Sequence, residues 1–137
     1  PASRFVADFV GNVNMLEGTV ASRDDRIATI AGATGAQIRV ENAGDVAPGA
    51  TVAFAIRPEK IRVSSKPPAD GTANVLEGEI WDLAYLGDMT VYHVRLDDGQ
   101  VVKASALNSA RVTEDPLTWH DRAWISFAPD AGVVLTQ

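Results

Sequence analysis

The sequence predicts an all-β chain that is built from two copies of one small barrel and begins with a short helix. Three observations support this fold class. The segment NMLEGTV at residues 14–20 returns sixty positions later as NVLEGEI at residues 74–80, and an echo at fixed spacing is typical of a duplicated structural unit. From Val13 onward, apolar and polar residues alternate over short segments, as in half-buried strands. Glycine and proline separate these segments, so we expect many short strands.

The first half begins with the helix and continues as five strands. Ser3 is a suitable N-cap, the apolar residues after it have helical spacing, and Gly11 ends the helix. We expect this helix to be a connector that docks on whatever precedes it. The strands are expected at residues 13–22, 26–30, 37–40, 50–56 and 61–63. A glycine-rich connection joins the second strand to the third, and a Pro-Gly turn precedes the fourth.

The second half repeats this plan. Its strands are expected at residues 74–83, 90–96, 100–104, 122–127 and 133–135, with a bend at residues 85–88 and a tight turn at residues 97–99. The run Ala128-Pro129-Asp130 stands where Arg57-Pro58-Glu59 stands in the first half. The halves therefore agree at both ends, and two five-stranded OB-like barrels are the simplest arrangement of these strands.

These patterns divide the chain into four segments. Residues 1–12 are the connector helix, residues 13–66 the first OB-like repeat, residues 67–73 a linker, and residues 74–137 the second OB-like repeat. The linker is placed there because its prolines, together with an Asp-Gly pair, make it the most linker-like stretch of the chain.

Composition narrows the classes of function. The 18 acids outnumber the 12 Lys and Arg residues and leave a net charge of −6, which disfavours binding to nucleic acid. The chain has no cysteine, so disulfides and thiolate metal sites are excluded. No apolar run approaches the roughly 20 residues that cross a bilayer, and the first residues given have neither the basic start nor the apolar stretch of a signal peptide. Because the chain begins at Pro1, we expect it to be a fragment of a longer protein.

No catalytic or cofactor-binding constellation is visible. His93 and His120 lack the companions that a zinc site needs, and no serine has the sequence signature of an activated nucleophile. A phosphate-binding loop of the GxxxxGK[ST] form is also missing. We therefore expect no catalytic, metal-binding or cofactor-binding residues in this chain.

The most distinctive polar cluster is Arg57-Pro58-Glu59. A fixed proline between opposite charges holds them at a defined separation, and an arginine can grip a carboxylate or phosphate at two points. These three residues are therefore candidates for a regulatory or interface site. The alternative is a strand-ending proline flanked by solvated charges or a structural ion pair, and spacing alone favours this alternative.

Two further candidate contacts lie in the second half. Tyr85, Gly87 and Asp88 place an aromatic ring, a flexible glycine and a carboxylate on one bend, where a small molecule or partner can bind; a β-bulge or corner at Gly87 is the simpler interpretation. Trp119 lies among polar residues and is a candidate for an interface. Trp124 is next to a strand and is expected in the core.

The repeated polar residues, Asn14 with Glu17 and Asn74 with Glu77, can be interpreted in two ways. They could line a site shared between the repeats. An Asn at the start of a strand more often satisfies a backbone group, and an acid in an alternating strand usually faces water. Structural roles are therefore favoured for all four residues.

These motifs resemble the region that follows the nucleotide-binding domain in the ATP-binding subunits of ABC importers. Residues 1–11, followed by Asn14, are similar to the junction after that domain, and FAIRPEKI at residues 54–61 resembles the IRPE motif of the regulatory region. NVLEG at residues 74–78, with YLG at residues 85–87 and then Thr90, is similar to its second repeat. The match covers nearly the whole chain in the right order. It is specific for tandem transport-associated OB (TOBE) repeats and is closest to spermidine/putrescine importers, with the maltose, glycerol-phosphate and iron types as neighbours.

The resemblance implies a regulatory and dimerisation domain of an importer ATPase subunit for polyamines. The parent subunit would be cytoplasmic and peripheral to the inner membrane through permease subunits. ATP hydrolysis, with ATP and magnesium, would reside in the domain before Pro1, so this fragment is not expected to be an enzyme. The implied partners are a second copy in a homodimer, the permease subunits, the ATPase domain, and a regulatory protein or small ligand.

The alternative function is a sensor that binds a small ligand, an oxyanion or a polyamine, between repeats or subunits. Molybdate-type relatives bind an oxyanion between subunits, yet the ligand motifs expected there are not evident around Ala104-Ser105-Ala106. The run Ala128-Pro129-Asp130 also departs from a second full RPE motif. The acidic balance favours a cationic ligand, and a stand-alone enzyme is the third hypothesis because no acid–base set appears.

Overall fold

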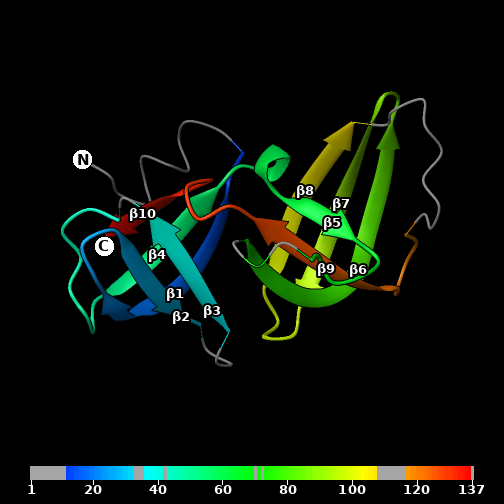
Figure 1. Cartoon of the computed structure of the whole chain (residues 1–137). Coiled ribbons are helices and arrows are strands. Elements are labelled where there is room, and N and C mark those ends of the chain that lie inside the picture. Colours follow the sequence, from blue (N-terminus) through cyan, green and yellow to red (C-terminus); the bar gives the residue numbers. More distant parts are fainter. Residues whose placement is uncertain are drawn as a thin grey trace. The chain divides into compact units, whose positions relative to one another are not determined.

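The computed structural model describes residues 12–32, 36–41, 43–69, 71, 73–107 and 117–136. In this part of the chain the all-β prediction is confirmed, with ten strands and one short 3-10 helix, η1 at Pro58–Lys60. None of the described helical segments is long and apolar enough to span a membrane. The predicted connector helix at residues 3–11 lies outside the described residues. The chain divides into two compact units, called unit 1 and unit 2 (Figure 1).

Unit 1 contains the described residues up to Arg57 and from Ala128 onward. Its strands are β1 (Asn14–Arg23), β2 (Ile27–Ala31), β3 (Gln37–Glu41), β4 (Thr51–Ile56) and β10 (Val133–Thr136). They form one antiparallel sheet in the order β10-β4-β1-β2-β3. The sheet curls until its edges approach: the Glu41 amide at the end of β3 donates a hydrogen bond of 3.0 Å to the Pro129 carbonyl, shortly before β10.

Unit 2 contains the described residues from Pro58 to Phe127. Its strands are β5 (Arg62–Ser64), β6 (Asn74–Leu86), β7 (Met89–Leu96), β8 (Val101–Leu107) and β9 (Arg122–Phe127). The sheet order is β5-β9-β6-β7-β8, again antiparallel. Both β5 and η1 contact β8 at the opposite edge. Each unit is therefore a curled five-stranded sheet that resembles an OB-type barrel.

The two units exchange their fifth strands. Strand β4 of unit 1 leads through η1 into β5, which pairs with β9 of unit 2. Strand β9 in turn leads into β10, which pairs with β4 of unit 1 (Figure 1). The chain thus passes from one unit to the other twice, between Arg57 and Pro58 and between Phe127 and Ala128.

This exchange differs from the predicted boundaries. The sequence prediction assigns the strand near residue 62 to the first repeat and the last strand to the second, whereas each belongs to the opposite sheet. The segment predicted as a linker, residues 67–73, lies within unit 2 between β5 and β6. Alternation along a strand specifies which face is buried but not which strand lies next to it. The exchange therefore leaves no local signal in the sequence.

The two sheets have the same register. Asn14 of β1 faces Ile56 of β4, and Asn74 of β6 faces Phe127 of β9. The pairings of the second, third and fifth strands also correspond, residue for residue. Over the positions that both sheets share, a residue of one sheet can therefore be assigned an equivalent in the other, and β6, β7 and β8 extend beyond the matching strands of unit 1.

The repeated Asn and Leu are explained by this shared geometry. Leu16 and Leu76 are both buried, and so are Asn14 and Asn74. The Asn14 side chain donates a 3.2 Å hydrogen bond to the carbonyl of Ile56 on the neighbouring strand. A buried amide needs such a partner, so Asn14 has the structural role expected of it, with a backbone group that is distant in the sequence.

The repeated glycine is required by close packing of the backbone. A Cβ atom added to Gly18 would lie 2.6 Å from the carbonyl oxygen of Ala31. A Cβ atom added to Gly78 would meet the carbonyl oxygen of Arg95, the residue of unit 2 that corresponds to Ala31. Both positions therefore exclude any side chain at the same point of the fold.

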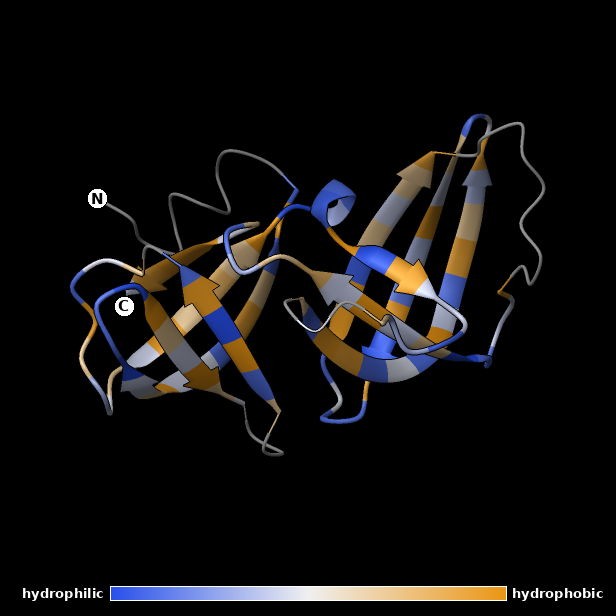
Figure 2. Ribbon diagram, in the orientation of Figure 1, coloured by the Kyte–Doolittle hydropathy of each residue, from blue (hydrophilic) through white to orange (hydrophobic). Residues whose placement is uncertain are grey.

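Apolar side chains fill both units. Figure 2 shows apolar and polar residues alternating along most strands. Among the fully buried side chains are Val20, Ile30, Val40, Val52 and Phe54 in unit 1 and Ile80, Val94, Val102 and Ile125 in unit 2. Burial of each such side chain stabilises the fold by about 1.5–3 kcal/mol. Because side chains occupy the inside of small barrels, the outer faces are the surfaces on which a functional site can lie.

Candidate functional site

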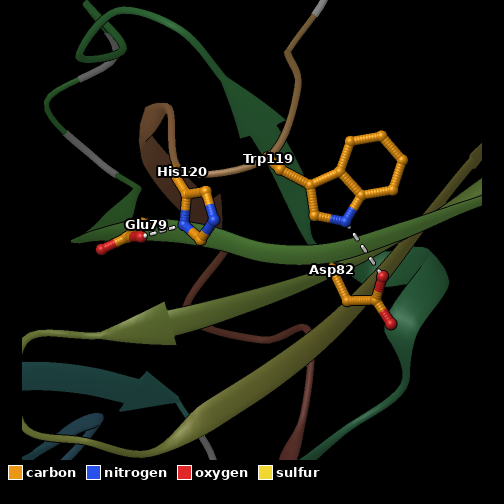
Figure 3. Close-up of polar contacts among 4 residues, drawn as sticks. All are labelled: Glu79, Asp82, Trp119 and His120. Carbon is orange, nitrogen blue, oxygen red and sulfur yellow. Dashed lines mark hydrogen bonds and ion pairs between the residues drawn. The ribbon is translucent and has the colours of Figure 1, made fainter.

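Unit 2 carries a group of exposed or half-buried aromatic and charged side chains on one outer face. We call it the tryptophan face and define it by Glu79, Trp81, Asp82, Arg95, Trp119 and His120. These residues come from β6, β7 and the turn before β9. Four of them are drawn in Figure 3.

Strand β6 provides the base of the tryptophan face. Its positions 76, 78 and 80 are buried, whereas Glu77, Glu79 and Trp81 are more exposed. Successive side chains of a strand point to opposite faces. Glu77, Glu79 and Trp81 therefore share the outer face of β6.

A β-bulge changes the direction of the next side chain. The register between β6 and β7 shifts between Ile80 and Asp82, so Trp81 is the inserted residue. Trp81 is 46% exposed, and Asp82 beside it is exposed as well. A bulge interrupts strict alternation, which allows two consecutive residues to contribute to one surface.

The turn before β9 has an unusual backbone conformation at His120. Within the described ranges, His120 is the non-glycine residue with a positive φ, 71°. Its amide donates a 2.7 Å hydrogen bond to the Ile80 carbonyl, and the Ile80 amide donates one of 2.9 Å to the Asp121 carbonyl. A positive φ costs a non-glycine residue about 1 kcal/mol or more. The surrounding structure therefore holds this turn in place.

Side chains also connect this turn to β6. His120 Nδ1 lies 2.7 Å from Glu79 Oε2, and Trp119 Nε1 donates a 3.2 Å hydrogen bond to Asp82 Oδ1 (Figure 3). Figure 3 shows the two rings leaving the turn in different directions, each toward its own carboxylate. In the described part of the chain, no three or more His, Asp or Glu residues are grouped to hold a metal ion.

Trp81 lies against two other side chains of the face. The His120 ring meets it edge to face, with 6.3 Å between ring centroids and 89° between planes. The guanidinium carbon of Arg95 is 4.9 Å from the centroid of the Trp81 ring. This distance is typical of a cation–π interaction, so the Trp81 ring already accepts a cation that the protein itself supplies.

Arg122 borders the tryptophan face, opposite Glu79 on β9. It donates a 2.9 Å hydrogen bond to Asp97 and lies 3.4 Å from Glu77. The hydrogen bond to Asp97 raises the pKa of the Arg122 guanidinium above its ordinary value. Arg122 is therefore a fixed positive charge at the edge of the face.

Acids outnumber bases on and around the tryptophan face. Four carboxylates and two guanidiniums are present, an excess of two negative charges when His120 is neutral: Glu77, Glu79, Asp82 and Asp97 against Arg95 and Arg122. The whole chain is also acidic, with a net charge of −6. The field of such a surface attracts cationic groups.

The equivalent positions of unit 1 carry small, uncharged side chains. The register of the sheets and the hydrogen bonds of the turns match the six residues of the tryptophan face with Thr19, Ala21, Ser22, Ala31, Pro48 and Gly49. The bulge is the same, because β1 shifts its register at Ala21 just as β6 does at Trp81. The backbone is shared, and only unit 2 has the aromatic and charged groups.

The turn is shared too, with glycine in place of histidine. The Gly49 amide donates a 2.8 Å hydrogen bond to the Val20 carbonyl, and the Val20 amide donates one of 2.9 Å to the Ala50 carbonyl. Gly49 has a φ of 93°. Glycine reaches this conformation without steric strain, so the backbone alone does not explain a histidine at position 120.

The three residues predicted at the RPE motif lie at the first crossing between the units. Arg57 and Glu59 are exposed, and Pro58 is buried at the start of η1. The Pro58 carbonyl accepts a 3.2 Å hydrogen bond from the Ile61 amide. None of the three belongs to the tryptophan face, and their regulatory role stays a prediction.

The bend predicted at residues 85–88 is the end of β6 and a hairpin turn. Leu86 pairs with Met89, which leaves Gly87 and Asp88 as a two-residue turn in place of the expected bulge. Gly87 has a φ of 71°, as such turns require of their first residue. Tyr85 is 65% exposed, and the contact role of this bend stays a prediction.

The structure places Trp119 on the tryptophan face with 48% of its surface exposed. The prediction that Trp124 lies in the core is wrong. Trp124 is half-buried and pairs with the outward-facing Glu77, while the neighbouring Ala123 and Ile125 are the buried residues of β9. The alternation of β9 therefore directs Trp124 outward.

Sequence reasoning did not identify five residues of the tryptophan face as a group: Glu79, Trp81, Asp82, Arg95 and His120. A signal was present, because the equivalent residues of the first repeat are all small. To recognise this signal, one must know where the bulge lies in the first strand of each sheet and how the second strand pairs with the first. Both arise from contacts between segments that are distant in the sequence.

Comparison with known proteins connects this chain to importer subunits. The family model of the TOBE domain matches residues 54–135. The chain is 37% identical over 137 residues to the putrescine transport ATP-binding protein PotG of Escherichia coli, covering 99% of the chain and 36% of that protein. It is 33% identical over 137 residues to the spermidine/putrescine import ATP-binding protein PotA of Chromobacterium violaceum, covering 100% of the chain and 38% of that protein. The chain thus spans little more than a third of the length of these relatives.

A solved structure shares the fold. The cytoplasmic molybdate-binding protein ModG, determined with molybdate bound, matches with a TM-score of 0.80 over 90% of this chain and 96% of ModG. The sequence identity is 14%. A similarity at this level of identity supports the OB-like architecture of the two units and says nothing about the ligand of this chain.

Proposed function

This chain belongs to the TOBE domain family, and from that premise we propose that it is the regulatory and dimerisation domain of the ATP-binding subunit of an ABC importer for polyamines. The domain would occupy the C-terminal part of the subunit. The observation that carries the proposal is the match to PotG and PotA relatives over almost the whole chain. The fold alone would not suffice, because one fold supports many functions.

The proposal assigns ATP hydrolysis to the part of the subunit that this chain does not cover. The chain contains no GxxxxGK[ST] loop, which ATPases of this kind use to hold phosphates. ATP and magnesium would bind to that other part, and this chain would not be an enzyme. The parent subunit would work on the cytoplasmic side of the inner membrane, with the permease subunits and a second copy of itself as partners.

The proposal is tested in the assembled transporter. We expect deletion of this domain from the parent subunit to alter the control of putrescine and spermidine uptake in cells, and to weaken subunit dimerisation measured by light scattering after size exclusion. The control is an ATPase-inactive subunit with the domain intact, which should lose uptake but keep its dimerisation. Unchanged transport control together with a monomeric full-length subunit would contradict the proposal.

A second candidate function, the sensing of a small ligand, is favoured by the acidic excess on the tryptophan face. This excess favours a polyamine over an oxyanion, because negative charge repels molybdate or sulfate. Calorimetric titration of the chain with putrescine, spermidine, molybdate and sulfate distinguishes the two ligand classes. Heat with the oxyanions alone would favour the oxyanion, and no heat with any of the four would leave only the first function.

A further inference from the structure

We propose that an apolar patch at the turn end of the β6–β7 hairpin joins two copies of this domain face to face, about a two-fold axis along β7. We call it the hairpin patch, and five side chains of β6, β7 and β8 define it: Ala84, Leu86, Met89, Val91 and Leu107. The choice of a second copy as partner rests on the proposed function in dimerisation. The location of the patch and the orientation of the two copies rest on the structure of unit 2.

The register of the three strands gathers these side chains on one face. Directly opposed residues of neighbouring strands share a face, and successive rows alternate between the two faces of the sheet. Leu83 and Ala104 belong to a row that points into the core, because both are buried. The rows on either side of the next inward-facing row therefore point outward, and they are Ala84–Val91–Ser105 and Leu86–Met89–Leu107.

The large side chains of the hairpin patch are exposed next to one another. Leu86 is 57% exposed and Leu107 is 76% exposed, and Met89 lies between them in the same row. On the other face of the hairpin, Tyr85 is 65% exposed. Single exposed apolar residues are normal on a protein surface, whereas a contiguous group with a polar border is typical of a protein interface.

The comparison with unit 1 indicates that the fold does not require this apolar extension. The β6–β7 hairpin is longer than the β1–β2 hairpin (Figure 1). Arg23 at the end of β1 corresponds to Leu83, so residues 84–86 have no counterpart in β1. Unit 1 turns at this point through three exposed charged residues, Asp24, Asp25 and Arg26. Its sheet still curls and closes, so the extension of unit 2 is available for another role.

Charge favours a second copy of the chain as the occupant of the hairpin patch. The chain has a net charge of −6, so two copies repel each other unless they meet on surfaces without an excess of acids. Residues 84–86, 89–91 and 105–107 of the three strands contain no charged side chain. The next outward-facing row is Asp82–His93–Lys103, which has an acid at one end and a base at the other.

A two-fold axis along β7 makes this surface complementary to itself. Strand β6 of one copy then faces β8 of the other, so that Asp82 lies opposite the partner's Lys103 and Leu86 opposite the partner's Leu107. Met89 lies near the axis, because it belongs to the central strand. The Trp119 indole and the Leu83 amide both donate to Asp82 Oδ1, so Oδ2 can accept a bond across the interface. Two-fold interfaces pair a surface with itself in this way.

Substitutions in the hairpin patch test its location. Leu86→Asp and Leu107→Asp each remove an apolar contact and place a charge in the interface, and each change occurs twice in a symmetric dimer. We expect the dissociation constant of the dimer to rise about a hundredfold, measured by sedimentation of the full chain. Val133→Asp, at an exposed apolar position of β10, is the matched control and should leave the constant unchanged. Circular dichroism checks that each variant is folded.

Charge reversal tests the orientation of the two copies. Asp82→Lys and Lys103→Asp should each weaken the dimer about fivefold, because like charges then face each other at both ends of the row. The double variant exchanges the two charges and should recover most of the affinity. A merely structural role of either residue would not produce this recovery.

Cross-linking tests the position of the axis. The chain contains no cysteine, so Met89→Cys introduces a single thiol. A bismaleimide whose span matches the spacing of about 10 Å between packed sheets should join two copies of this variant rapidly. Val133→Cys is the control and should react with the reagent without forming cross-linked dimers.

Three results would overturn the proposal: a chain that stays monomeric at millimolar concentration, an unchanged dissociation constant in both Asp variants of the patch, or no recovery in the charge-reversal double variant. Equal cross-linking of Met89→Cys and Val133→Cys would overturn it as well. Loss of permease binding by the parent subunit in Leu86→Asp, with dimerisation intact, would overturn it in favour of a permease partner.

Failure of the hairpin patch is distinguishable from failure of the proposed function. Altered transport control after deletion of the domain, together with an intact dimer in Leu86→Asp, would reject the patch alone. Normal transport control after the deletion, together with a dimer that dissociates in Leu86→Asp, would reject the proposed function and leave the patch as a dimer surface.

Discussion

Unit 1 and unit 2 have the same backbone register but different outer faces. Over the length that both sheets share, strand pairings, bulges and the hydrogen bonds of one turn agree residue for residue. On the outer face, each aromatic or charged residue of the tryptophan face has a small counterpart, as Trp81 has in Ala21. The difference teaches that residues shared by the units specify the fold, whereas residues that differ are available for function.

The largest effect is expected from removal of β10, which tests the exchange of the fifth strands. Val134 and Leu135 of β10 are buried in unit 1. The deletion removes these two side chains and also the backbone hydrogen bonds between β10 and β4. It should therefore lower the free energy of unfolding of unit 1 by about 5 kcal/mol. In urea titrations, circular dichroism should then show an early transition, while tryptophan fluorescence from unit 2 persists to higher urea.

Leu135→Ala is a milder form of the same change, with an expected loss of about 3 kcal/mol. Thr136→Ala, at an exposed position of the same strand, is the matched control and should have little effect. A common shift of fluorescence and circular dichroism in the β10 deletion would show that the two units unfold together and are not independent sheets.

The next effect tests the equivalence of Gly18 and Gly78. Alanine at either position would place a Cβ atom against a backbone carbonyl of the neighbouring strand. We expect Gly18→Ala and Gly78→Ala each to lower the free energy of unfolding by about 3 kcal/mol. Thermal denaturation followed by circular dichroism measures both. Gly71→Ala is the control, because a Cβ atom there has nothing within 4 Å.

A smaller effect is expected from exchanging the residues of the shared turn. His120→Gly relieves a positive φ and loses an exposed contact with Glu79, so the free energy of unfolding should rise by about 1 kcal/mol or less. Gly49→His should lower it by about 1 kcal/mol. Urea denaturation measures both variants. A marked loss of stability in His120→Gly would show that His120 supports the fold and would weaken the functional interpretation.

The smallest effect concerns acid pH and the β1–β2 turn of unit 1. Amides of Ile27 and Arg26 donate hydrogen bonds of 2.7 and 2.8 Å to Asp24 Oδ1. These bonds, with that from Ile27 the larger cause, lower the pKa of Asp24 from its ordinary value of 3.8. Because the folded-state pKa is depressed, the stabilisation is present above the unfolded pKa and is lost as the pH falls through the folded pKa.

Thermal melts across the acid range measure this contribution, and Asp24→Ala should reduce the pH dependence. The equivalent hairpin of unit 2 turns at Gly87, which has a positive φ of 71°. This turn is formed by a glycine, which has no ionisable side chain. Asp88→Ala in that turn is the matched control and should leave the pH dependence nearly unchanged. An equal reduction in both variants would contradict the assignment to Asp24.

Much of the fold could be predicted because its signals are local. All ten strands were expected close to where they occur, since alternation and turn residues act over a few positions. Trp119 was expected at a surface for a similar reason, because its neighbours are polar. The prediction for Trp124 was wrong because the sequence indicated the strand but not which of its two faces points into the core.

The sequence by itself determined that the chain is a duplicated all-β protein, with Asn, Leu and Gly in equivalent places. Strand formation depends on residues that are close along the chain, and the repeat is visible because each copy is a short continuous segment. Only the tertiary structure decided that β5 and β10 are exchanged between the units and that Trp81, Arg95 and His120 lie together. Strand partners and the position of a bulge are set by packing and hydrogen bonds between distant segments, which local periodicity does not encode.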